Sequence, residues 1–177
     1  MTGVQTCALP IYKITDLGEK GTLITTLLII HGLLAVALLG AITHQTLAVC
    51  WPRRKAPEDH FSGRFRAVNA AAYSNAIVVL YVATMVLGAV IYPEFRVSIR
   101  SVVEELGQRA VMGAFEAKEH FVVVGMAMLA PYWYFWRTPL AEQYAGARKW
   151  LTALLAIIVW WGFLVGHIIN NIRGYVA

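Results

Sequence analysis

The chain has 177 residues, of which 59% are hydrophobic and only 14% are charged, and its formal net charge is +5. Soluble domains usually contain about 25% charged residues. This composition therefore argues against a soluble enzyme, a disordered chain, a disulfide scaffold and a nucleic-acid-binding module. The mean hydropathy of +0.60 instead predicts a protein whose main partner is the lipid bilayer, with its positive charge acting as a topology signal.

The N-terminal segment, residues 1–20, is expected to lie outside the folded domain. Residues 1–11 read MTGVQTCALPI and have neither helical nor strand periodicity. This run resembles a translated sequencing adapter, so we expect residues 1–11 not to be native and exclude them from the fold. Residues 21–177 are expected to form a single transmembrane domain.

Four stretches are long and apolar enough to cross a hydrocarbon core, which takes about 20 residues of α-helix. We therefore expect an all-α membrane protein with four transmembrane helices in an up-down bundle. The second helix is expected to stop at Pro93, and the third, which contains Pro131, to take extra length from the segment near Phe115. The predicted spans are residues 23–49, 68–92, 115–136 and 150–169.

A further helix is expected between the second and third spans. Apolar residues recur there at helical spacing, starting with Phe95 and Ile99. On another face, Arg100 and Glu104 lie four residues apart and can form an ion pair. We predict that residues 95–112 form an amphipathic helix that lies in the interface and roofs the bundle.

An even number of spans places both termini and the loop 93–120 on one side of the membrane, which we call the terminal side. The loops 50–67 and 137–149 then lie on the opposite, loop side. These two short loops hold eight of the fifteen Lys and Arg residues. Because basic short loops stay in the cytoplasm, we expect a bacterial inner-membrane protein with its termini outside.

Three of the five histidines are expected to meet in the terminal-side leaflet. His31 lies in the first span, His120 opens the third, and His167 lies in the last turn of the fourth. Ionisable residues inside a membrane are costly and mark candidate functional sites. Histidines on facing helices can ligate haem iron, so we predict a b-type haem held by His31 and a second histidine, with Arg96 and Arg100 near the propionates.

The same histidines are also candidates for a metal site. Glu116 precedes His120 by one helical turn, and an imidazole and a carboxylate at that spacing can share a metal ion. The predicted metal ligands are His31, Glu116, His120 and His167.

Three functions follow as alternatives. The first is a small b-type haem protein for electron transfer, or a membrane subunit that works with other redox subunits. The second is a non-catalytic structural or assembly subunit, in which the histidines only pack and form hydrogen bonds. The third is a metal or proton transporter that uses the His and Glu residues. No Walker A loop, GxSxG, HExxH or CxxCH motif is present, so hydrolytic or nucleotide-driven chemistry has no sequence support.

Overall fold

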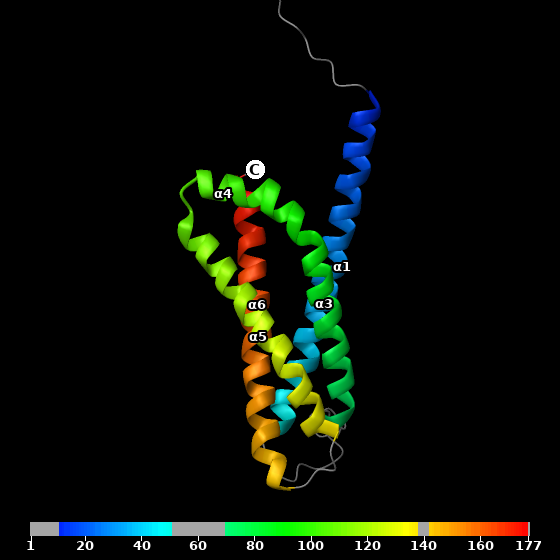
Figure 1. Cartoon of the computed structure of the whole chain (residues 1–177), viewed down its shortest axis with the longest axis vertical. Coiled ribbons are helices and arrows are strands. Elements are labelled where there is room, and N and C mark those ends of the chain that lie inside the picture. Colours follow the sequence, from blue (N-terminus) through cyan, green and yellow to red (C-terminus); the bar gives the residue numbers. More distant parts are fainter. Residues whose placement is uncertain (1–10, 51–69, 138–141, 177) are drawn as a thin grey trace, which may run out of the picture.

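The structure is a computed structural model that describes residues 11–50, 70–137 and 142–176, and every regular element in these ranges is a helix (Figure 1). The predicted non-native segment, apart from Ile11, lies outside the described residues. Most of the loop 50–67 and the start of the loop 137–149 also lie outside them.

Four long helices alternate in direction between the two ends of the molecule (Figure 1). The elements in chain order are α1 (Ile11–Cys50), η1 (Ala70–Ala72), α3 (Tyr73–Phe95), η2 (Arg96–Arg100), α4 (Ser101–Glu105), α5 (Arg109–Arg137), η3 (Glu142–Tyr144) and α6 (Ala145–Val176). Helix α1 packs against α3 and α6, and α5 packs against α6 and α3. The start of α1, the short helix α4 and the end of α6 all lie at the terminal side.

Three of the described helices are long and apolar enough to cross a membrane: Gly21–Cys50, Tyr73–Phe95 and Glu142–Ile169. These agree with the first, second and fourth predicted spans and make the chain a multi-pass membrane protein by length and composition. Helix α5 is not among these candidate spans. The predicted third span at residues 115–136 is therefore helical, but its crossing of a membrane is not confirmed.

The prediction that Pro93 stops the second helix is wrong. Helix α3 continues through Pro93 to Phe95 and passes directly into the π-helix η2. The backbone N–H of Arg96 donates to the carbonyls of Pro93 and Tyr92. A proline near a helix end removes one hydrogen bond and can be accommodated by a change of helical winding, so the chain turns here without leaving the helix.

The predicted amphipathic helix is also shorter than expected, because it ends at Glu105 and not at residue 112. Gly107 adopts a positive φ of 70° and ends the helix in a Schellman motif. In this motif the N–H of Gly107 donates to Glu104, and the N–H of Gln108 donates to Val103. Glycine adopts this conformation without the steric cost of a Cβ, so α5 starts two residues later in a new direction. The predicted Arg100–Glu104 ion pair is confirmed at 2.7 Å.

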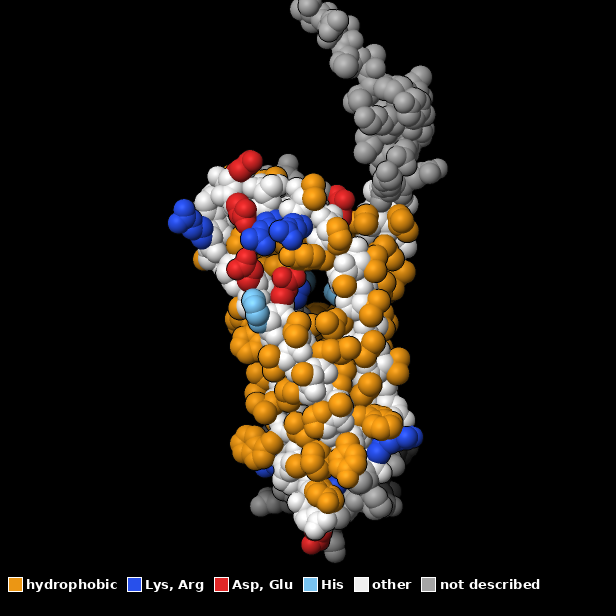
Figure 2. All heavy atoms as spheres, viewed as in Figure 1, with side chains coloured by type: hydrophobic (Ala, Val, Ile, Leu, Met, Phe, Trp, Pro, Cys, Tyr) orange, Lys and Arg blue, Asp and Glu red, His pale blue; other side chains and the backbone are white. Residues whose placement is uncertain are grey.

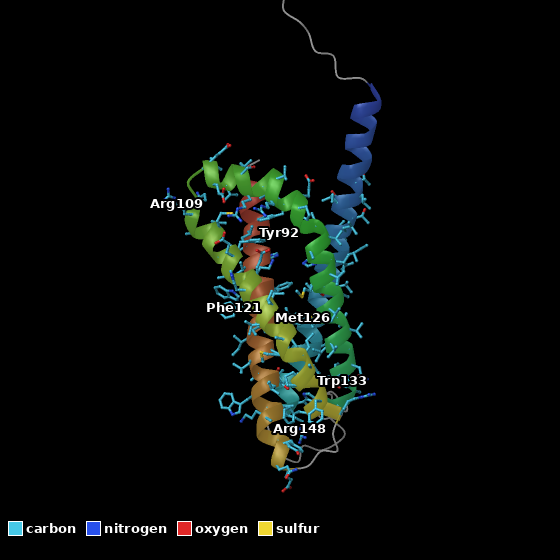
Figure 3. The ribbon with its side chains drawn as sticks, viewed as in Figure 1. Tyr92, Arg109, Phe121, Met126, Trp133 and Arg148 are labelled. Carbon is cyan, nitrogen blue, oxygen red and sulfur yellow. The ribbon has the colours of Figure 1, made fainter. Side chains whose placement is uncertain are left out.

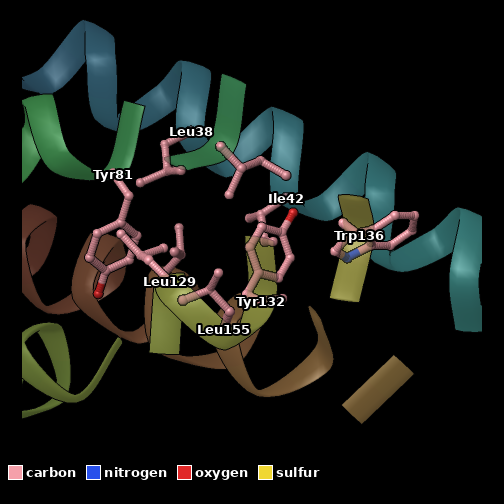
Figure 4. Packing of buried hydrophobic residues seen from close by; sticks show 10 residues of the cluster. Leu38, Ile42, Tyr81, Leu129, Tyr132, Trp136 and Leu155 are labelled. Atoms are coloured by element: carbon pink, nitrogen blue, oxygen red, sulfur yellow. The ribbon is translucent and has the colours of Figure 1, made fainter. Parts of the chain in front are cut away.

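The loop-side half of the bundle contains a closely packed core to which all four long helices contribute (Figure 4). Its buried members include Leu38, Ile42, Ile77, Tyr81, Leu129, Tyr132, Trp136 and Leu155. Hydrogen bonds tie the same helices together: Tyr132 donates to Gln45, and Trp136 Nε1 donates to Thr152 Oγ1 at 3.1 Å. This half of the molecule is therefore fixed by both packing and polar contacts.

Candidate functional site

Toward the terminal side, α5 leans away from α3 (Figure 1). The two helices meet at the lower end of this region, where Tyr81 Oη donates to the carbonyl of Val122 at 2.8 Å. They meet again at the upper end, where Tyr92 of α3 stacks on Phe115 of α5 with ring centroids 6.4 Å apart. The two contacts are about 16 Å apart along α3, at 1.5 Å per residue. The helices therefore frame a space between them.

Figure 2 shows an opening in this face of the molecule, below the segment formed by η2 and α4. Lys or Arg atoms and histidine atoms are visible at the opening, and acidic and basic side chains gather directly above it. We call this space the terminal-side chamber and define it by His31, Gly88, Phe115, Lys118 and Glu119, which the contacts described below connect.

His31 is half-buried and lies with the edge of its ring against α3. A Cβ added to Gly88 would lie 3.3 Å from Cε1 and 3.8 Å from Nδ1 of the imidazole, so a larger residue at this position would require the ring to shift by a few tenths of an ångström. Nδ1 is buried and has no hydrogen-bond partner of normal geometry among the described residues. The backbone of Thr84 nevertheless lies within reach of the ring as a hydrogen-bond partner of poorer geometry. The imidazole is therefore held by its packing against Gly88 together with this backbone contact.

Lys118 enters the chamber from α5. Its side chain is half-buried, and its Nζ lies 4.6 Å from the centroid of the Phe115 ring. The ammonium is close enough to interact electrostatically with both His31 and Glu119. Phe115 in turn stacks on Phe95 with centroids 4.2 Å apart. The chamber therefore combines one imidazole and one cation with an aromatic upper wall.

Arg100 connects the segment above the chamber to α5. Its Nε donates to Glu104 at 2.7 Å, and its Nη2 donates to Glu116 at 3.0 Å. The hydrogen bond to Glu104 and the negative charges of both carboxylates raise the pKa of the exposed Arg100 guanidinium. Arg100 therefore connects η2 and α4, above the chamber, to α5. Its guanidinium already pairs with the carboxylates of Glu104 and Glu116, so these contacts compete with any ligand carboxylate.

The three predicted histidines differ in their surroundings. His31 is half-buried at the chamber, whereas His120 and His167 are both exposed. A ring nitrogen of His120, Nδ1, is 2.7 Å from the carbonyl of Glu116 on its own helix, and His167 stacks on Phe163 with centroids 6.1 Å apart. Among the described residues these contacts join neither His120 nor His167 to His31, and the identity of the second haem ligand stays a prediction.

The predicted propionate-binding arginines and the predicted metal ligands also differ in their contacts. Arg96 is exposed beside Arg100 but shares none of its ion pairs. In the part of the chain that the structure describes, no three His, Cys, Asp or Glu side chains lie close enough to hold a metal ion. The set of His31, Glu116, His120 and His167 is therefore not assembled as a metal site.

Sequence reasoning did not select two residues that define the chamber, Gly88 and Lys118. A glycine in the middle of an apolar span often marks a close helix contact, and this was the available signal for Gly88. Lys118 begins the stripe of positions 118, 122, 125, 129 and 132, whose spacing follows one face of a helix. The inner members of that stripe are buried or half-buried, so the spacing alone could have placed Lys118 on the inward face.

A second polar cluster lies in the loop-side half, and its contacts are structural. Buried His44 stacks on Tyr73 with ring centroids 4.8 Å apart, and buried Gln45 accepts the hydrogen bond of Tyr132. These side chains join α1 to α3 and α5, as polar residues between membrane helices commonly do.

No protein-family model, curated protein or solved structure matches the chain. The fold and the site together define a multi-pass helical membrane protein with an ionisable chamber between its helices. The function is therefore argued from the chemistry of that chamber.

Proposed function

We propose that this protein is a four-span protein of a bacterial inner membrane whose terminal-side chamber binds a b-type haem, with His31 as axial ligand. It would transfer electrons as a membrane subunit of a redox complex. The observation that carries the proposal is the half-buried imidazole of His31 at an opening between helices, whose buried Nδ1 has no hydrogen-bond partner of normal geometry among the described residues. Imidazole is a common ligand of haem iron.

The contacts of α5 support its role as the fourth span. It has 29 residues, more than the roughly 20 that a membrane crossing needs. Its inward face packs against α6 and α3, and large apolar side chains such as Val123 and Val124 are exposed on its outward face. Phe121 points away from the bundle (Figure 3). An outward apolar face is expected where a helix contacts lipid.

The chamber favours a haem with one protein ligand over the predicted haem with two. His120 and His167 are both more exposed than His31, which supports His31 as the single protein ligand. We therefore expect haem with an open sixth position that an added ligand such as carbon monoxide can occupy. Lys118 and the aromatic upper wall supply a cation and flat apolar surface for the rest of the cofactor.

The test is the visible spectrum of the detergent-purified protein, expressed with haem precursor, before and after reduction and then with carbon monoxide. We expect a Soret band that shifts with carbon monoxide, is lost in His31→Ala and is kept in the matched control His167→Ala. External imidazole should restore the band to His31→Ala. A monodisperse wild-type protein that stays colourless with full haem supply contradicts the proposal.

A second candidate is proton transfer through the membrane domain, and the proximity of His31, Lys118 and Glu119 favours it. Titratable groups inside membrane proteins often form proton relays. In this case the colourless protein, reconstituted in liposomes with a pH-sensitive dye, should conduct protons under an applied potential, and Glu119→Gln should reduce the rate.

A further inference from the structure

We propose that Lys118 is the anchor for a carboxylate of the ligand that occupies the chamber, so that the ligand is a membrane-soluble carboxylic acid. The inference rests on the proposed function, where that acid is a haem propionate. The inference can also hold without haem, because the carboxylate of a fatty acid has the same chemistry as a haem propionate.

The first step is the position of Lys118. It lies on the inward stripe of α5, one turn from Val122, whose carbonyl accepts the hydrogen bond of Tyr81. Its side chain is half-buried, in contrast to exposed His120 two residues later. Because successive residues turn by about 100° around a helix, the two side chains point to different sides. Lys118 therefore faces the space between the helices.

The second step is the balance of its interactions. Removing an ammonium from water is costly unless an opposite charge or hydrogen bonds compensate. Among the described residues Lys118 forms no ion pair, and its one close contact is the cation–π interaction with Phe115. Glu119 acts on it only from a distance, and Glu116 is occupied by Arg100. A ligand carboxylate would supply the compensating charge.

The third step is the nature of the ligand. The opening in Figure 2 faces sideways, between α3 and α5; apolar side chains cover the surface below it, and charged side chains lie directly above it. The aromatic rings of Tyr92, Phe95 and Phe115 stack along its upper edge. A molecule that enters by this route needs an apolar or aromatic body to pass through the bilayer and an acidic group to reach Lys118.

The experiment compares two porphyrins that differ only in charge. Purified wild type, Lys118→Gln and the matched control Lys149→Gln, which removes an exposed lysine of α6, are titrated with haem and with haem whose two propionates are esterified. We expect wild type and Lys149→Gln to bind haem about tenfold or more tightly than the ester. Lys118→Gln should bind both alike, and Lys118→Arg should recover the preference.

Lys118→Gln with an unchanged preference for the free acid overturns the inference while leaving haem binding intact. If wild type binds neither porphyrin, the haem proposal fails, and the same proteins are then titrated with a fluorescent fatty acid. Binding that is lost in Lys118→Gln and recovered in Lys118→Arg supports the carboxylate anchor without haem. Equal or absent fatty-acid binding in all variants overturns it.

Discussion

Three helices pack closely at Gly125, and replacing this glycine with alanine tests the packing directly. An alanine Cβ would lie 2.9 Å from Cζ of Tyr81 and 3.1 Å from Cγ2 of Ile158, and closer still to the Tyr81 hydroxyl. Tyr81 is buried and its hydroxyl is bonded to the carbonyl of Val122. The ring therefore has little freedom to move away from the added methyl group.

The magnitude follows from opposing contributions. Overpacking a core costs about 1–3 kcal/mol, and displacing the Tyr81 hydrogen bond costs about 1 kcal/mol more. Alanine has a higher helix propensity than glycine by up to about 1 kcal/mol, which offsets part of this cost. We expect Gly125→Ala to lower the free energy of unfolding by about 1–3 kcal/mol. Gly113→Ala, in the same helix with nothing within 4 Å of the added Cβ, should not lower it.

The assay is reversible unfolding in mixed detergent micelles with increasing sodium dodecyl sulfate, followed by tryptophan fluorescence. Tyr81→Phe removes the hydroxyl that the methyl group would meet, so the double variant with Gly125→Ala should be more stable than the sum of the two single effects predicts. Strict additivity, or a Gly125→Ala protein as stable as Gly113→Ala, would refute the reasoning, because the helices would then not touch at this point.

Two further predictions concern the loop-side core and the topology. Tyr132→Phe should destabilise the bundle by about 1–2 kcal/mol in the same assay, because it removes a buried hydrogen bond to Gln45, whereas Trp133→Phe removes an exposed one and should cost less. In a protein with Cys7 and Cys50 replaced by serine, Gln108→Cys should react with an impermeant maleimide from outside the cell, and Lys149→Cys only after permeabilisation. Equal reactivity of both cysteines in intact cells would exclude the four-span topology.

The helical architecture could be predicted from the sequence because long apolar runs fix the positions of α1, α3 and α6. The ends of elements were harder to predict. Pro93 was expected to terminate a helix, but the helix continues through it and passes into the π-helix η2. The pattern of apolar residues continues past Gly107, although the positive φ of this glycine ends the helix there. In both places local backbone geometry decides the outcome, and hydrophobic periodicity does not report it.

The level of the candidate site along the bundle could be predicted from the sequence more readily than the side chains that face it. Antiparallel threading fixes the level of a residue along the bundle, and His31 and His120 share that level within about a turn. It does not fix the direction around the helix axis, which changes by about 100° per residue. That direction depends on which face of α5 packs against its neighbours. The contact at Gly125 settles it, and consequently Lys118 lies inward and His120 outward.

The division of the bundle into a packed half and an open half bears on how the site works. Below Tyr81 the four long helices are joined by a buried core and by hydrogen bonds between side chains. Above it, α3 and α5 are joined by stacked rings, and the exposed Arg100–Glu116 pair joins η2 to α5. Exposed ion pairs contribute little to stability. Local opening therefore costs least at the terminal side. A ligand that bridges His31 and Lys118 would connect α1 to α5 in the half where this chain supplies the fewest contacts of its own.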